Sequence, residues 1–469
     1  MKTFSEHLDT QYTIRQNLAL FITATIAGFV SVLFLYKGLP VEIFFLLIGF
    51  TICLVSMISF ETAQFFFLTL IFLPYIYALR IHPSAIYTLF LFISALFSLK
   101  NGMLQKAKNP LWFPLFFYFI TTLPSLVNTP RLILSIRDMS NQLALFLIFF
   151  VSLNAFDSAD KIRKIFYFFI AAVFLHSLYV VYLGITVDRR AFGLLGVYYI
   201  DFAALAGLLT FILVLYLRGV KRIIASIIFA ISTLGLILTQ TRNAWISFAF
   251  AIVTLMIYLI FKGESFYIKR RTITRILVFS VLLIASVFIF AGSVNTKLES
   301  RVDLANESVV NDDPVSIGAN SLASRVLIWY TAGLAFLQHP YIGIGSYSFK
   351  HTSDLYYKIP KGFFKLYVEG RTPHVTYLQV LTETGILGMM GFLFFIFSLI
   401  REMRKLLSVE KSKEEITLTL MIAWSFVYII FSMFMTESWL YGQYIVWIGV
   451  LLGFLINFQR ILNAKSKVN

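Results

Sequence analysis

Residues 324–345 read SRVLIWYTAGLAFLQHPYIGIG, and residues 371–388 read RTPHVTYLQVLTETGILG. Together they close the only long polar interruption in a chain that otherwise consists of apolar runs. The first piece places apolar side chains at helical spacing until Pro340, Gly343 and Gly345 break the pattern. The second piece returns the chain to an apolar helix. These two pieces therefore predict a long, partly helical loop between membrane-spanning segments.

The composition assigns the chain to the membrane proteins. Of its 469 residues, 59% are hydrophobic, 17% are aromatic and 13% are charged, whereas soluble domains carry about 25% charged residues. Apolar runs recur along the whole chain, unlike the one short run of a signal peptide. A lone cysteine, Cys53, excludes an intrachain disulfide and a cysteine metal cluster. We therefore expect an all-α polytopic membrane protein.

Apolar runs of about 17–25 residues predict membrane-spanning helices. Because Pro83, Pro114 and Pro124 bound or interrupt some of the runs between 63 and 156, we expect 12–14 such helices. The runs lie at residues 17–36, 42–59, 63–80, 84–99, 111–128, 141–156, 165–184, 199–217, 221–239, 243–262, 275–293, 384–401, 416–435 and 440–457. The predicted parts are a bundle at 1–293, a loop subdomain at 294–383, and C-terminal helices with a tail at 384–469.

The positive charge predicts the orientation of the bundle. The formal net charge is +16, but most basic residues lie in alternate short loops, which is typical of cytoplasmic loops and not of nucleic-acid binding. Both termini should then be cytoplasmic, and the segment 294–383 should lie on the outer face. Its first part is acidic, and residues 326–336 predict an amphipathic helix on the membrane surface. Its many aromatic residues favour the membrane interface or stacking on sugar rings.

Arginines on the outer face need an explanation. Arg190 precedes a helix, and Arg242 lies in a tight turn between two apolar runs. A charge at this depth marks a functional site by default, and guanidinium groups match phosphate oxygens bidentately. Arg190 and Arg242 are therefore candidate diphosphate ligands, and Arg189 is a weaker candidate. The alternative is that Arg242 pairs with a carboxylate such as Asp201 or Glu437.

His374 is a candidate general base. It begins the apolar helix that follows the loop, three residues after Arg371, which is a candidate supporting cation. A histidine can accept a proton near neutral pH, and neighbouring arginines keep its imidazole neutral. The sequence has no metal-ligand spacing and no nucleotide-binding loop on this face, so we expect neither a metal nor another cofactor.

Several motifs of this sequence resemble those of the bacterial O-antigen ligase superfamily. The resemblance rests on Ser324-Arg325 with Trp329 and Ala332, on His339-Pro340 with Gly343-Ile344-Gly345 and Phe349, and on Pro373-His374 with Tyr377-Leu378-Gln379 and Glu383-Thr384-Gly385-Ile386-Leu387-Gly388. The turn Thr239-Gln240-Thr241-Arg242 with Ala244-Trp245, and Arg190 with Gly193 and Gly196, are similar to two further family segments. The specific matches cover residues 190–390.

The resemblance implies a GT-C-type membrane glycosyltransferase of the bacterial inner membrane, with its active site facing the periplasm. Such enzymes move a glycan from undecaprenyl diphosphate to an acceptor: lipid A–core for ligases, a growing glycan for polymerases, and Ser or Thr for protein oligosaccharyltransferases. By the same resemblance, Arg190 and Arg242 bind the diphosphate, His374 is the base, and Arg325 is a signature residue that supports them. Where the family often has asparagine after the histidine, this chain has Val375.

The sequence leaves several functional alternatives open. We expect lipid A–core as the acceptor, while a polymerase that extends a growing glycan is the alternative within the superfamily. A polysaccharide-lipid transporter is the alternative from another class. It would place charged residues near mid-membrane, in repeat-related broken helices, whereas the charges here gather at one face. Membrane lipids are the only other expected partners.

Overall fold

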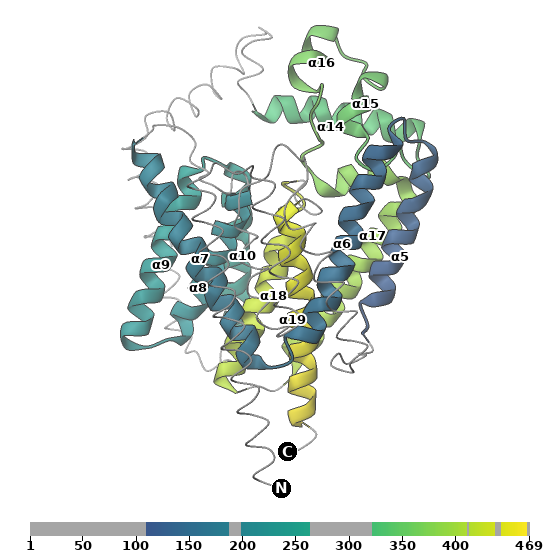
Figure 1. The fold of residues 1–469 in the computed structure, drawn as a ribbon. Helices are drawn as coiled ribbons and strands as arrows, with labels where there is room; N and C mark the ends of the chain where they lie inside the picture. Colours follow the sequence, from purple (N-terminus) through teal and green to yellow (C-terminus); the bar gives the residue numbers. More distant parts are fainter. Residues whose placement is uncertain (1–108, 187–197, 263–320, 410–411, 437–441, 467–469) are drawn as a thin grey trace, which may run out of the picture. The chain divides into compact units, whose positions relative to one another are not determined.

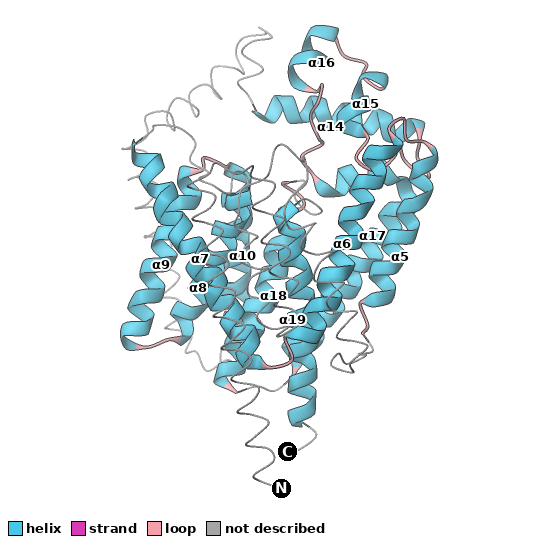
Figure 2. Ribbon diagram, in the orientation of Figure 1, coloured by secondary structure: helices cyan, strands magenta, loops and turns pink. Residues whose placement is uncertain are grey.

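The computed structural model describes residues 109–186, 198–262, 321–409, 412–436 and 442–466, and these residues form helices without any strand (Figure 2). Five predicted spans, at 17–36, 42–59, 63–80, 84–99 and 275–293, lie outside the described residues. In chain order (Figure 1), the helices are α5 Trp112–Thr122, η1 Leu123–Val127, α6 Leu132–Ala155, α7 Ala159–Thr186, α8 Tyr198–Tyr216, α9 Gly219–Leu238, α10 Arg242–Lys262, α14 Ser321–Gln338, α15 Phe349–Thr352, η4 Ser353–Leu355, α16 Lys361–Tyr367, α17 Thr376–Ser408, α18 Lys413–Ser432 and α19 Gly442–Ser466.

Eight of these helices (α6 to α10 and α17 to α19) are long and apolar enough to cross a membrane. The expected all-α polytopic membrane fold is thereby confirmed for the described part of the chain. The run predicted at 111–128 forms the shorter pair α5 and η1.

One predicted helix start was wrong: α6 begins at Leu132 instead of near residue 141. α17 begins at Thr376, and the span predicted from residue 384 corresponds to its part after the kink at Gly385. The additional turns contain polar residues that an apolar-run criterion leaves out. Tertiary hydrogen bonds satisfy them: the hydroxyl of Ser135 donates to the carbonyl of Ser346 at 2.6 Å, and the carboxylate of Glu383 accepts from the amide of Tyr347 at 2.9 Å.

The described residues divide into two compact units, each built from distant parts of the chain. The first contains 143–165 and 442–457. A β-carbon at Gly453 would lie 2.5 Å from Cβ of Ser152, so the absence of a side chain permits close packing of α19 on α6. The amide of Asn457 donates to the carbonyls of Leu153 and Phe156, at 3.0 and 2.8 Å, and so satisfies the C-terminal end of α6.

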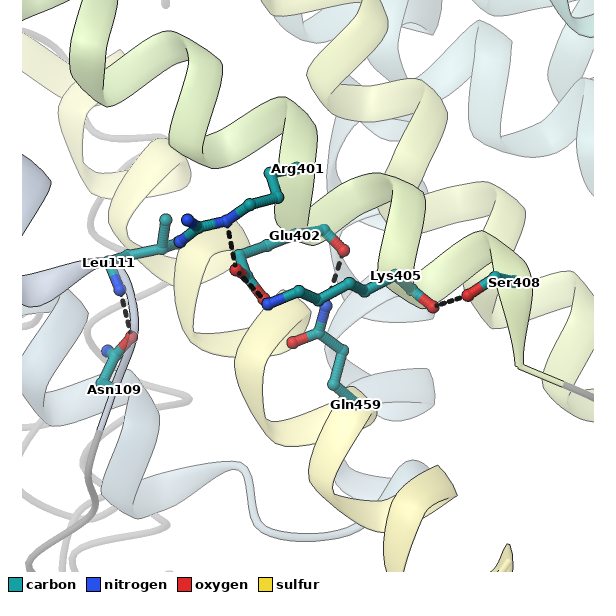
Figure 3. Close-up of polar contacts among 7 residues, drawn as sticks. All are labelled: Asn109, Leu111, Arg401, Glu402, Lys405, Ser408 and Gln459. Carbon is teal, nitrogen blue, oxygen red and sulfur yellow. Dashed lines mark hydrogen bonds and ion pairs between the residues drawn. The ribbon is translucent and has the colours of Figure 1, made fainter.

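The second unit contains 109–142, 166–441 and 458–469. Within it, α8 packs against α9, α10 and α18, while α17 packs against α5. Glu402 of α17 is almost fully buried and pairs with Lys405 at 2.9 Å and Arg401 at 3.2 Å. The amide of Gln459 donates to the Glu402 carbonyl at 2.6 Å (Figure 3). This buried carboxylate is therefore compensated by two cations, as burial of a charge requires.

The loop between α14 and α17 carries α15 and α16 (Figure 1), and it has a hydrophobic core of its own. Ile328, Ala332 and Ala335 of α14 face a set of buried residues: Ile344, Phe349, Tyr356, Phe364, Tyr367 and Val368. The expectation that the loop aromatics lie at the membrane interface or stack on sugars is wrong for Phe349, Tyr356, Phe364 and Tyr367. They are buried because a loop of this length can exclude water only by packing its own large side chains.

A backbone interaction attaches this loop to α17. The amides of Ile344 and Gly345 donate to the carbonyls of Thr382 and Glu383 at 3.2 and 3.0 Å, and the amides of Ile386 and Leu387 donate to the carbonyls of Pro340 and Tyr341 at 2.8 and 3.1 Å. The interaction is possible because α17 is kinked at Gly385, whose φ is +67°. Carbonyl groups in the turn that follows α14 thus accept hydrogen bonds from amides of α17, which would bond within the helix if α17 were unbroken.

Candidate functional site

The candidate site lies where the N-terminal ends of α10 and α17 meet residues 433–436, the turn that follows α18 (hereafter the α18 turn). From α17, the backbone amide of Thr376 donates to the carbonyls of Met433 and Thr436 at 2.8 and 3.0 Å. The hydroxyl of Thr376 donates to the carbonyl of Thr436 at 2.8 Å. From α10, the amide of Asn243 donates to the carbonyl of Met435 at 2.7 Å. One short turn therefore fixes the N-terminal ends of α10 and α17.

Arg242 is the first residue of α10, directly before Asn243, and its side chain is exposed. The turn that precedes it is held at two points. The Thr239 hydroxyl donates to the carbonyl of Leu236 at 2.6 Å, and the indole of Trp245 donates to the same carbonyl at 3.1 Å. Gln240 in this turn has a φ of +53°, an uncommon value for a residue with a side chain. The predicted Thr239–Arg242 turn is therefore a tightly defined element that orients Arg242.

His374 lies directly before the N-cap residue of α17 and is half-buried. The carbonyl of its neighbour Pro373 accepts a hydrogen bond from the indole of Trp329 at 2.9 Å. On its other side, Thr376 is bonded to the α18 turn. His374 itself has a φ of +56°, and left-handed residues of this kind occur often at active sites, where the surrounding structure pays for the strain. The backbone that carries the imidazole is thus fixed from both sides.

Arg325 joins this assembly from α14. Its guanidinium Nη1 donates to Oδ1 of Asn243 at 3.0 Å, and Trp329 lies one helical turn further along α14. Of the two signature residues, Arg325 therefore bonds the start of α10, and Trp329 bonds the segment before α17.

Five residues named from the sequence have other outcomes. The guanidinium of Arg371 donates to the carbonyl of Leu366 at 2.9 Å, and its side chain is exposed. Asp201, which was an alternative partner for Arg242, is buried and accepts a hydrogen bond from the hydroxyl of Tyr428 at 2.7 Å. Arg189 and Arg190 lie outside the described residues, as does Glu437, so their roles stay predictions.

Sequence reasoning missed Asn243 and Thr376. Both bond backbone carbonyls of the α18 turn, which is 192 and 60 residues away along the chain. Their only sequence signal is their place beside Arg242 and His374. Among the residues that the structure describes, no group of three or more His, Cys, Asp and Glu side chains is arranged to hold a metal ion.

A family comparison matches this same region. Residues 227–393 match the family model described as O-antigen ligase. No curated protein matches the chain. The matched segment contains Arg242, Arg325 and His374, and it extends from α9 through the loop core into α17. The resemblance inferred from the sequence motifs is thereby confirmed: residues 227–393 contain an O-antigen ligase domain, which supports membership of the O-antigen ligase superfamily.

Proposed function

We propose that this protein is an O-antigen ligase-type glycosyltransferase of the bacterial inner membrane. It transfers a glycan from undecaprenyl diphosphate to an acceptor hydroxyl, here lipid A–core, on the periplasmic face. Arg190 and Arg242 bind the diphosphate, and His374 takes the proton of the attacking hydroxyl. The family assignment supports the ligase or polymerase class, and the residue roles are our inference.

The proposed chemistry needs only groups that this chain supplies. The acceptor oxygen attacks the anomeric carbon as the bond from that carbon to the diphosphate oxygen breaks, so the anomeric configuration inverts. The proton of the acceptor moves to the imidazole of His374. The diphosphate leaves with its electron pair, and the guanidinium groups of Arg190 and Arg242 stabilise its increased negative charge. Holding donor and acceptor together supplies the remaining reduction of the barrier.

One observation carries the proposal. The α18 turn is hydrogen-bonded to Asn243, the neighbour of Arg242, and to Thr376, two residues after His374. The neighbours of a cationic residue and of a histidine, from distant parts of the chain, are thus attached to one element. This supports the proposal of a leaving-group site next to a general base.

A transfer assay in detergent tests the roles of the two residues. The purified protein is given an undecaprenyl-diphosphate-linked glycan and lipid A–core, and Arg242→Ala and His374→Ala are compared with Arg218→Ala. Arg218 is an exposed arginine that precedes α9 at its opposite end from the Arg242 turn. We expect Arg242→Ala to lower kcat by about 10²–10³-fold and His374→Ala by at least about 10²-fold, with Arg218→Ala unchanged. Wild-type transfer by either site variant would overturn its proposed role.

The same assay separates the candidate acceptors. With lipid A–core present, a ligase makes one product in which the glycan is attached to the core. If lengthening of the lipid-linked glycan occurs instead, without any core, the protein is a polymerase. A protein that moves the donor across proteoliposomes, yet forms no new glycosidic bond, would be a transporter, and the enzyme proposal would fail.

A further inference from the structure

The side chain of Asn243 connects two helices and the α18 turn. Its Oδ1 accepts a hydrogen bond from Nη1 of Arg325 at 3.0 Å, while its Nδ2 donates to the carbonyl of Met435 at 2.7 Å. Asn243 belongs to α10, Arg325 to α14, and Met435 to the α18 turn. Each end of the amide therefore has a partner of the matching type, which fixes the orientation of the amide plane.

This orientation bears directly on Arg242, which precedes Asn243 in the chain. Arg242 is exposed and follows the left-handed residue Gln240, and the indole of Trp245 attaches the first turn of α10 to the carbonyl of Leu236. The bridge through Asn243 fixes that first turn against α14 and against the α18 turn. Since the α18 turn also holds Thr376, the bridge sets the position of Arg242 relative to the segment of His374.

We infer that Asn243 and Arg325 are positioning residues that act as one unit, with Arg325 acting through Asn243 on the placement of Arg242. This inference rests on the proposed function and deepens it. The guanidinium of Arg325 is half-buried and bonds the Asn243 side chain. The competing assignment makes Arg325 a third ligand of the donor diphosphate.

The two assignments differ in their kinetics. A diphosphate ligand touches the donor in the ground state as well as in the transition state, so its loss raises KM for the donor besides lowering kcat, independently of Asn243. A positioning residue leaves the donor ligands present but misplaced, so its loss lowers mainly kcat. A displacement of about 1 Å costs on the order of 10²-fold in rate. Two residues of one unit should also be strongly non-additive.

A double-mutant cycle in the transfer assay tests the inference. The variants are Asn243→Ala, Arg325→Gln and the double variant, with Arg218→Ala as the exposed control. We expect each single variant to lower kcat by about 10–100-fold with KM for the donor within about threefold of wild type. The double variant should be no worse than the more damaged single variant, within about threefold.

An isosteric variant tests each half of the bridge. Asn243→Asp keeps the acceptor for Arg325 but replaces the donor to the Met435 carbonyl with an oxygen. We expect it to lose most of the activity that Asn243→Ala loses, because the contact with the α18 turn is broken. If Asn243→Asp is fully active, the contact with the α18 turn does not position Arg242, and the inference is overturned.

Other outcomes overturn the inference in distinguishable ways. If Arg325→Gln raises donor KM and its loss multiplies with that of Asn243→Ala, Arg325 is a diphosphate ligand. If a single variant does not fold, Arg325→Lys, which retains the charge, replaces Arg325→Gln, or Asn243→Asp replaces Asn243→Ala, and thermal midpoints of all variants are compared. If the wild-type protein forms no glycosidic bond at all, the proposed function fails together with this inference.

Discussion

Three non-glycine residues in the described part of the chain have left-handed backbone, and two of them, Gln240 and His374, belong to the candidate site. Gln240 is buried at 7% exposure. We predict that Gln240→Val lowers the free energy of unfolding by roughly 1–3 kcal/mol, because a β-branched residue does not tolerate a positive φ. Gln240→Asn is the control, since asparagine adopts this conformation readily. Thermal midpoints in detergent measure both; equal midpoints would show that the turn is not strained.

Arg242 and His374 could be found from the sequence at this scale, whereas Asn243 and Thr376 could not. A charge in a tight turn between apolar runs is costly, so its presence in the sequence indicates a functional residue. The contacts of Asn243 and Thr376 are with backbone carbonyls of Met435, Met433 and Thr436. Every residue has a backbone carbonyl, so the sequence cannot show which carbonyl will be the partner. Only folding brings the carbonyls of the α18 turn close to Asn243 and Thr376.

At the scale of elements, the contact between the 339–345 turn and α17 can be tested by comparing the stability effects of alanine at three glycines. At Gly333 a β-carbon would meet nothing within 4 Å, and φ is not positive. At Gly370 the space is also empty, but φ is +71°. At Gly343 φ is +71° as well, and a β-carbon would lie 2.4 Å from the backbone of Glu383. Conformational strain and steric overlap can therefore be separated by three alanine substitutions.

We predict a clear order of stability. Gly333→Ala should be neutral or stabilise the fold by up to about 1 kcal/mol, because alanine favours the interior of α14. Gly370→Ala should cost about 1–2 kcal/mol for the left-handed backbone alone. Gly343→Ala should cost clearly more than Gly370→Ala, because the backbone interaction with α17 must open. Urea or thermal unfolding of the purified variants gives the order, and equal losses at Gly343 and Gly370 would contradict the observed backbone contact.

The sequence predicted helices better than it predicted their breaks. The apolar runs at 199–217, 221–239 and 243–262 correspond closely to α8, α9 and α10, because periodic apolar residues determine helices locally. The kink at Gly385 was not predicted. It depends on Pro340 and Tyr341, whose carbonyls accept the amides of Ile386 and Leu387. The signature glycines are therefore explained by contact between two elements and not by either element alone.

At the scale of the whole molecule, the hydropathy pattern determines the membrane fold, but it says little of tertiary packing. The loop illustrates this limit. Its aromatic residues are consistent with a membrane interface, a sugar site or a core, since all three favour aromatic side chains. The structure places Phe349, Tyr356, Phe364 and Tyr367 in a core with α14. Such a loop is a folded part of the molecule, and its stability contributes to that of the whole protein.

This loop makes the stability of the whole protein depend on pH. His351 of α15 is partly buried and lies near Arg131 and Lys350, so burial first, and then these two cations, lower the pKa of its imidazole. In the unfolded chain the pKa is near its ordinary value of about 6.5. The unfolded state therefore binds the proton more readily, and stability rises with pH in this range. The contribution is complete above about pH 6.5 and is lost as the pH falls toward the lower pKa of the folded protein.

We predict that the thermal midpoint of the wild-type protein, measured at one scan rate between pH 7.5 and 5, decreases below about pH 6.5. His351→Gln should flatten part of this decrease, because glutamine binds no proton. Arg131→Gln should also reduce it, since removing a nearby cation moves the pKa of His351 back toward its ordinary value. Lys358→Gln, which changes an exposed lysine of the same loop, should leave the pH profile unchanged. A wild-type profile that His351→Gln does not alter would exclude this histidine as the titrating group.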